Sequence, residues 1–290
     1  MAEALPPPQT ILGRLAVGQL CSTNDAAANL KKCTELAVEA KKQGAAFLSL
    51  PECFAFMGTP GTTQTRENAE PLSGPTFQKY RQMARDTGMW LSLGGFHEVC
   101  AEEEGKVYNT HAILDDKGEM VAVYRKLHLF DVDVDGGFKE SRSTRKGEHA
   151  LVVKGTPIGT VGVTTCYDVR FPELYTSLRE AGAHVILVPS AFMPTTGAAH
   201  WEVLLRARAI ETQCYVGAAA QFGQHNEKRS SWGHAVLIDP WGKVLSDLGS
   251  EAGGVGVCDI SMSEIETVRA RMPVQSHRRK DVCEIVVGGA

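Results

Sequence analysis

The sequence predicts a mixed-sheet α/β fold in which two sheets pack together and helices lie outside them. Short apolar runs typical of strands alternate with amphipathic helical segments along most of the 290 residues. Several neighbouring strands are joined by tight turns rich in Asp, Gly or Pro, which indicates hairpins and argues against a purely parallel sheet. The composition, 43% hydrophobic and 22% charged, is that of an ordinary globular protein.

The N-terminal part alternates strands with helices. We expect strands at Arg14–Leu20, Ala46–Leu50 and Met89–Gly94, and helices at Asn24–Gln43 and Pro75–Thr87. Gly44 and Gly88 follow the two helices and are the natural residues to end them. Pro51 directly follows the second strand and stops it.

The remainder is richer in strands. We expect strands at Tyr108–Leu114, Met120–Lys126, Leu151–Val153, Thr160–Thr165, His184–Pro189, Cys214–Ala220, Gly233–Asp239, Lys243–Ser246 and Gly253–Ile260. Helices are expected at Pro172–Ala181, Trp201–Gln213 and Ser261–Met272. Ser261 and Glu264 have the spacing of a capping box. The stretch between Phe130 and Ala150 has few apolar residues and is long for a connector, so it is a candidate active-site loop.

We expect one compact domain over residues 1–290, with a core from about 14 to 280 and short tails. The formal charge of −4 provides no basic field, so nucleic acid is not an expected partner. The sequence contains no run of 18 apolar residues, so we expect no membrane span. The eight scattered cysteines lack metal-ligand spacing, so we expect reduced thiols and no metal. The N-terminus shows no targeting pattern. The cytoplasm is the expected location, with an organellar form left open.

A polar residue stands at the end of three predicted strands or directly beyond it: Glu52, Lys126 and Cys166. Strand ends that converge at one edge of a sheet commonly gather catalytic groups. A cysteine is a nucleophile for an amide carbonyl, and a carboxylate can take its proton. A lysine ammonium and the backbone N–H of Tyr167 could stabilise the resulting oxyanion. Taken one at a time, Cys166 could be an inert buried thiol, Lys126 a solvated strand end and Glu52 a surface turn residue. Only their combination favours acyl transfer.

The segments around these residues resemble the nitrilase superfamily of carbon–nitrogen hydrolases. LPE ending at Glu52, YRKLHLF around Lys126 and TTCYDVRFPEL around Cys166 resemble its glutamate, lysine and cysteine segments, in the same order and spacing. The match runs from about Arg14 to Lys280. The resemblance implies a four-layer α-β-β-α sandwich with these three residues catalytic. It also implies a small-molecule amide substrate, a cysteine thioester intermediate, no cofactor, and a homodimer or larger homo-oligomer.

Further residues are candidates for supporting roles. The family carries an ES pair after the lysine loop, which implies that Glu140 positions Lys126 or the substrate, unless it is an exposed loop carboxylate. On a continuing strand, His128 would share a face with Lys126, as a support or simply as a packed histidine. Arg170, four residues after Cys166, could clamp a substrate carboxylate or form an ion pair with Asp168 or Glu173.

Further segments resemble the Nit1 branch of the superfamily, among them WLSLGGFHE at 90–98 and QSHRRKD at 275–281. This implies metabolite repair, by hydrolysis of the terminal amide of deaminated glutathione to the acid plus ammonia. An ω-amidase, an N-carbamoylase or a nitrilase would share the triad, and a silent scaffold protein would keep the fold without catalysis. The chain departs from the family pattern at Asp135, where a proline is usual, and in its tail RRKDVCEIVVGGA. Loop order and tail packing therefore stay open.

Overall fold

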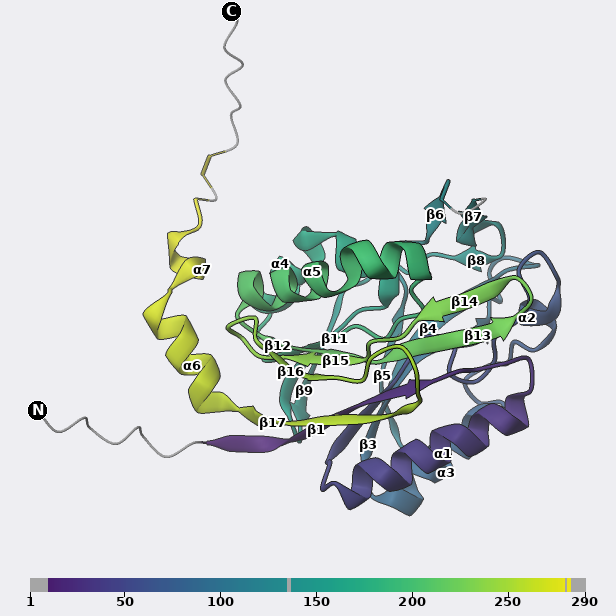
Figure 1. The fold of residues 1–290 in the computed structure, drawn as a ribbon, viewed down its shortest axis with the longest axis horizontal. Helices are drawn as coiled ribbons and strands as arrows, with labels where there is room; N and C mark the ends of the chain where they lie inside the picture. Colours follow the sequence, from purple (N-terminus) through teal and green to yellow (C-terminus); the bar gives the residue numbers. More distant parts are fainter. Residues whose placement is uncertain (1–9, 135–136, 280, 283–290) are drawn as a thin grey trace, which may run out of the picture.

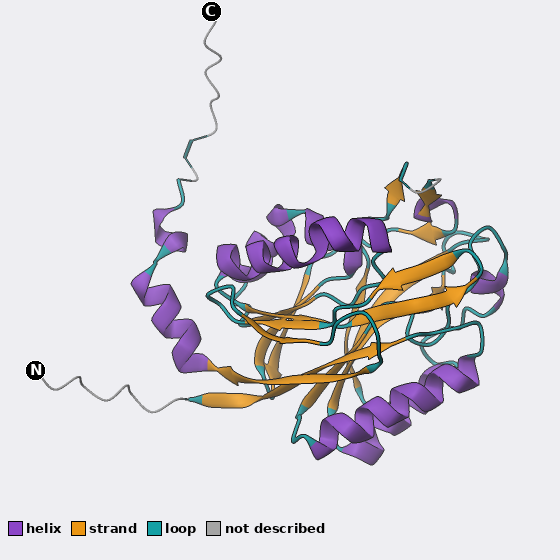
Figure 2. Cartoon of the chain, viewed as in Figure 1, coloured by secondary structure: helices purple, strands orange, loops and turns teal. Residues whose placement is uncertain are grey.

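The computed structural model describes residues 10–134, 137–279 and 281–282. Two sheets lie face to face (Figures 1 and 2), with α1 (Ala26–Lys42) and α3 (Pro75–Thr87) over one sheet and α4 (Pro172–Glu180) and α5 (Pro194–Thr212) over the other. The mixed-sheet prediction and the α-β-β-α sandwich are therefore confirmed. Asp135 and the last eight residues lie outside the described residues, so the expectations about that loop position and the tail stay predictions.

The larger sheet has the strand order β14-β13-β1-β2-β3-β4-β5, with β17 beside β1 and β8 beside β4. Its strands are β1 (Ile11–Leu20), β2 (Phe47–Leu50), β3 (Trp90–Val99), β4 (Val107–Leu114), β5 (Met120–Arg125), β8 (Thr144–Arg145), β13 (Ala220–Asn226), β14 (Arg229–Trp232) and β17 (Gly254–Ser261). Strands β1, β2 and β3 are parallel, whereas β4 and β5 continue antiparallel through hairpins. The sheet therefore mixes both pairings, as the hairpin turns predicted.

The second sheet has the order β16-β15-β12-β11-β10-β9. Its strands are β9 (Leu151–Thr156), β10 (Gly159–Val163), β11 (Val185–Leu187), β12 (Tyr215–Ala218), β15 (Val236–Ile238) and β16 (Val244–Asp247). Strands β10, β11 and β12 are parallel. Smaller elements are α2 (Gln64–Glu67), β6 (Asp131–Val132), β7 (Phe138–Lys139), η1 (Glu140–Arg142), η2 (Cys166–Arg170), α6 (Met262–Arg271) and α7 (Val274–His277).

Apolar side chains from the two sheets form the central core. Leu15 and Val17 of β1 are fully buried in one cluster with Val185 and Leu187 of β11. Gly217 lies where the sheets approach, because a Cβ there would lie 2.9 Å from Leu15. A core of this kind stabilises the fold by about 25 cal/mol per Å² of apolar surface buried, and it holds the strand ends at fixed positions.

Two local predictions need correction. Helix α5 begins at Pro194 rather than at Trp201, because proline suits the first helical position and the polar first turn hides the apolar face. The strand expected at Cys214–Ala220 ends at Ala218, and a β13–β14 hairpin follows that was not predicted. Its polar run QHNEKRSS masks the strand pattern.

The predicted capping box is formed in part. The Ser261 hydroxyl accepts from the Glu264 amide at 3.2 Å, but the Glu264 carboxylate accepts from the Tyr215 hydroxyl instead of bonding the Ser261 amide. In the described part of the chain, no helix is long and apolar enough to cross a bilayer.

Candidate active site

Three strand ends bring the predicted catalytic side chains to one cavity. Glu52 follows β2, Lys126 follows β5, and Cys166 follows β10 from the opposite sheet. All three line a cavity of about 440 Å³ between the sheets' edges and the surrounding loops. This volume falls within the usual range for small-molecule sites. The convergence inferred from the strand ends is therefore what the structure shows.

Cys166 lies at a sharp turn between β10 and the short helix η2. Its φ of +51° is in the left-handed region, which is uncommon for a residue with a side chain. The turn is fixed because the Cys166 amide donates to the Pro189 carbonyl at 3.0 Å. The first helical-type bond nearby joins the Asp168 amide to the Thr165 carbonyl, and the Tyr167 amide precedes it at the start of the helix. A strained strand-to-helix turn of this kind presents the Cys166 side chain to the cavity and leaves a backbone donor beside it.

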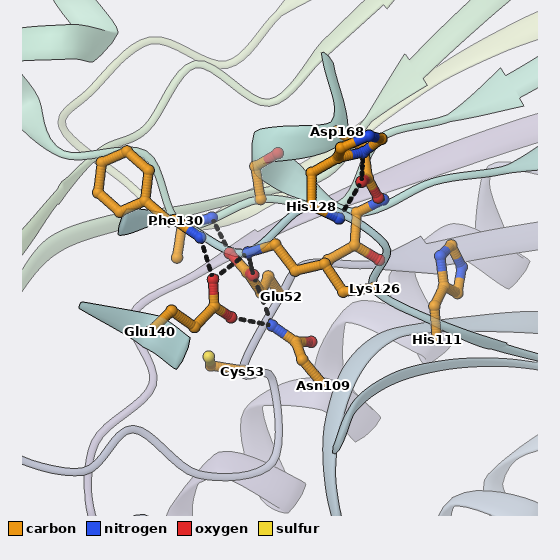
Figure 3. A network of polar contacts seen from close by, with 12 residues as sticks. Glu52, Cys53, Asn109, His111, Lys126, His128, Phe130, Glu140 and Asp168 are labelled. Atoms are coloured by element: carbon orange, nitrogen blue, oxygen red, sulfur yellow. Dashed lines mark hydrogen bonds and ion pairs between the residues drawn. The ribbon is translucent and has the colours of Figure 1, made fainter. Parts of the chain in front are cut away.

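Lys126 is held between two carboxylates (Figure 3). Its ammonium donates to Glu52 Oε1 and Glu140 Oε2, each at 2.9 Å. Asn109 completes the network, because its Nδ2 donates to Glu52 at 2.8 Å and to Glu140 at 3.1 Å. The Phe130 amide donates to Glu140 at 2.7 Å. All four polar side chains are buried, so these bonds fix the ammonium in one place.

Asn109 was not predicted from the sequence. It is a polar residue in the first half of β4, a strand that is buried along its whole length. A carboxamide inside such a strand must find partners, and this was the available signal. Glu140, by contrast, lies where the family pattern implied, beside Lys126 rather than exposed in the loop.

The electrostatics of the cluster indicate its resting protonation state. Burial alone would lower the pKa of Lys126, but the charges of Glu140 and Glu52 outweigh it and hold that pKa well above its ordinary value. Burial would raise the pKa of Glu52, but the charge and hydrogen bond of Lys126 hold it below its ordinary value. Burial and the charge of Glu52 raise the pKa of the Cys166 thiol well above its usual range. The resting site therefore holds a neutral thiol beside a carboxylate and an ammonium.

Gly95 keeps room for this network. A Cβ at this position would lie 2.9 Å from both Glu52 Cγ and Asn109 Oδ1. Real Cβ atoms rarely approach other atoms so closely, so any larger residue would displace the carboxylate or the carboxamide. The Gly95 carbonyl also accepts from the Cys53 amide at 3.0 Å, which fixes the turn directly after Glu52.

His128 is not on a continuing strand beside Lys126, because β5 ends at Arg125. Its ring instead contacts Asp168 Oδ1 at 2.8 Å and stacks on Phe171 at 3.7 Å between ring centroids. Asp168 also accepts from the His128 amide at 3.0 Å. His128 does not line the cavity, and its contacts join the lysine turn to the cysteine turn.

Arg170 forms neither of the expected ion pairs with its own segment. Its guanidinium contacts His200 Nδ1 at 3.2 Å and lies 5.7 Å from the Tyr167 ring. It does not line the cavity, whereas Tyr167 does. The expected substrate clamp is therefore not placed at the cavity by this geometry.

Among the described residues, no group of three or more His, Cys, Asp or Glu side chains is arranged to hold a metal ion. The cysteines in the described ranges are all free thiols.

The family of the protein follows from its similarity to known proteins. The model of the carbon–nitrogen hydrolase family matches residues 14–270, and the chain belongs to that family. The deaminated glutathione amidase of Dictyostelium discoideum is 47% identical over 92% of this chain and 94% of its own. The Homo sapiens deaminated glutathione amidase is 48% identical over 92% of this chain and 83% of its own.

Among solved structures, the Caenorhabditis elegans NitFhit protein matches with a TM-score of 0.86 at 41% identity. The match covers 94% of this chain and 66% of that protein. The resemblance to the nitrilase superfamily drawn from the sequence motifs is therefore confirmed. The chain is similar throughout to members of the branch that the further segments indicated.

Proposed function

We propose that the protein is an amidase that hydrolyses deaminated glutathione through a thioester on Cys166. The observation that supports the reaction class is the buried Lys126 ammonium, held by Glu52 and Glu140 beside a thiol on a strained turn. The substrate rests on the names of the relatives, which cover most of this chain. A cavity of about 440 Å³ has room for a small, peptide-like molecule.

The proposed first half-reaction makes the thioester. As the Cys166 sulfur attacks the amide carbonyl carbon, Glu52 takes the thiol proton. The negative charge then moves to the carbonyl oxygen, where the Lys126 ammonium and the Tyr167 amide stabilise it. The carbon–nitrogen bond breaks as Glu52 returns the proton to the departing nitrogen.

The second half-reaction restores the enzyme. Glu52 takes a proton from water as the water oxygen attacks the thioester carbon. The tetrahedral intermediate collapses, the carbon–sulfur bond breaks, and the proton returns to Cys166. The product is a carboxylic acid, and the cycle needs only side chains, backbone amides and water.

The expected release of ammonia needs correction for this substrate. Glutathione is a tripeptide whose amide nitrogens all join two residues, so its deaminated form has no primary amide. Hydrolysis beside the oxidised residue releases the cysteinylglycine dipeptide and 2-oxoglutarate. Ammonia would leave only from primary amides such as α-ketoglutaramate, and an ammonia assay alone would miss the proposed reaction.

The test is a side-by-side assay of four substrates: deaminated glutathione, α-ketoglutaramate, an N-carbamoyl amino acid and a simple nitrile. Chromatographic detection of each acid product gives kcat/KM for the wild type and for Cys166→Ala. Fast turnover of the first substrate, lost in the variant, is the expected result. Preference for another substrate would indicate an ω-amidase, a carbamoylase or a nitrilase. If none of the four substrates is turned over, the hypothesis that remains is a catalytically silent scaffold protein.

We further propose that residues from about 14 to 280 act as one catalytic domain that forms a homodimer through α5. Val203 and Ile210, seven positions apart on this helix, are 69% and 48% exposed, and the adjacent Trp241 is 60% exposed. An exposed apolar stripe of this kind is typical of an interface. Light scattering of the wild type and Val203→Glu checks the assembly. A cytoplasmic location suits the reduced thiols, and cell fractionation checks it.

A further inference from the structure

The cavity has a positively charged wall that the proposed chemistry does not use. Arg229 and Lys228, at the tip of the β13–β14 hairpin, line the cavity together with the catalytic residues. Among the described residues, the acidic side chains that line it are Glu52 and Glu140, and both are bonded to Lys126. The hairpin therefore adds positive charge to a cavity whose carboxylates are already satisfied.

Arg229 is held in place without forming an ion pair to any acidic residue that the structure describes. Its guanidinium lies 5.8 Å from the centroid of the Phe138 ring of β7, and both residues line the cavity. Arg229 pairs with Asn226 in the hairpin register, and its carbonyl accepts from Gln224 Nε2 at 3.2 Å. Within the described ranges, no ion pair or side-chain hydrogen bond is formed by its guanidinium. It is half-buried, whereas Lys228 at the turn is exposed.

The charge of Arg229 reaches the catalytic end of the cavity. It contributes, after the burial and the lysine interactions already described, to the low pKa of Glu52. After burial, it also helps to lower the pKa of His97, another lining residue, to about 4. A half-buried guanidinium that lines the same cavity as the catalytic residues can contact the distal part of the same small substrate.

We propose that Arg229 binds a carboxylate of the substrate and makes the enzyme select acidic amides over neutral ones. The inference deepens the proposed function and rests on it. A guanidinium offers a planar fork that bonds both oxygens of a carboxylate, and such charge-assisted bonds are stronger than neutral ones. Lys228 adds charge at the entrance, where it attracts acidic substrates without fixing their orientation. Arg170 cannot take this role, because it lies outside the cavity.

The test compares deaminated glutathione with its dimethyl ester, which keeps the reacting amide and loses both carboxylate charges. The measured quantity is the preference, the kcat/KM for the diacid divided by that for the diester. Arg229→Met should reduce this preference roughly 10- to 100-fold, mainly through KM of the diacid. Arg229→Lys should lose less, because it keeps the charge without the fork. The matched control is Arg271→Met, an exposed arginine of α6 far from the cavity, which should leave the preference unchanged.

A binding experiment separates the inference from the proposed function. Calorimetry measures the Kd of glutarate, a dicarboxylate that resembles the acid product, for the wild type and Arg229→Met. Weakening of roughly tenfold or more supports the inference even if the true amide substrate proves different. Unchanged glutarate binding and an unchanged preference in Arg229→Met overturn it. If the wild type does not turn over deaminated glutathione but binds glutarate in a way that depends on Arg229, only the proposed substrate is overturned.

Discussion

Replacing Glu140 by Gln tests whether this carboxylate holds the Lys126 ammonium, which we propose stabilises the oxyanion. The substitution keeps the shape of the side chain but removes the charge that Lys126 contacts at 2.9 Å. Hydrogen bonds to charged groups are worth about 1.5–3 kcal/mol, and 1.36 kcal/mol corresponds to a tenfold change. We therefore expect kcat/KM to fall roughly 10- to 150-fold. Glu52 still holds the lysine at 2.9 Å, so activity should not vanish.

The pH dependence of kcat/KM in Glu140→Gln distinguishes an electrostatic role of Glu140 from a purely structural one. After burial, which lowers it, the charge of Glu140 is the largest influence on the pKa of Lys126, and it raises that pKa. Without this charge, the pKa of Lys126 falls and the buried ammonium loses its proton at a lower pH. The high-pH limb of kcat/KM should therefore move to lower pH in Glu140→Gln. A purely structural role for Glu140 predicts lower activity with the limb in its original place.

The assay is kcat/KM for the amide across pH, measured by chromatography of the acid product. Glu148→Gln is the matched control, because Glu148 is an exposed glutamate of the same segment, 3.7 Å from Arg145. The control should keep both the rate and the profile. A Glu140→Gln enzyme with wild-type kcat/KM would refute the argument that two carboxylates are needed to hold Lys126.

Three further substitutions follow from the same geometry. Cys166→Ala should lower kcat by more than about 10⁴-fold in the product assay, with a melting temperature near that of the wild type; residual activity close to wild type would contradict the nucleophile. Asn109→Ala removes one donor from both Glu52 and Glu140, so kcat should fall roughly 10- to 100-fold with little change in KM, and a change confined to KM would count against a positioning role. Gly95→Ala places a Cβ 2.9 Å from Glu52 and Asn109 and should lower both kcat and the melting temperature, as steady-state kinetics and calorimetry can show. An active, equally stable Gly95→Ala protein would mean that the network can shift.

The sequence predicted the strand framework well because apolar periodicity and turn residues are local signals. Helix α3 spans the predicted Pro75–Thr87, and the three catalytic candidates lie at strand ends as expected. The β13–β14 hairpin was missed because most of its side chains are polar, including the buried Gln221, His225 and Ser231, so the hairpin shows little apolar alternation. Arg229, which this hairpin presents to the cavity, was missed with it.

Contacts between residues that are distant in the sequence could not be predicted from local sequence patterns. Asn109 meets Glu52 and Glu140 only after β4 is paired in the sheet and the lysine loop folds over it. His128 could not be placed, since its contact with Asp168 depends on how two distant turns meet. In both cases the residue type signalled a need for partners, but the identity of the partner depends on tertiary packing.

The buried, paired charges also suit the site to the proposed reaction. Burying ions is costly unless they are paired, and here one ammonium faces two carboxylates that Asn109 also bonds. In the proposed mechanism, the thiol proton moves to Glu52 while the sulfur charge passes to the carbonyl oxygen beside Lys126. Charge is thus relocated within the cluster without any change in its total, so little solvent reorganisation is required. A thiol with a low resting pKa is then unnecessary, because proton transfer can accompany attack. This agrees with the raised pKa of Cys166.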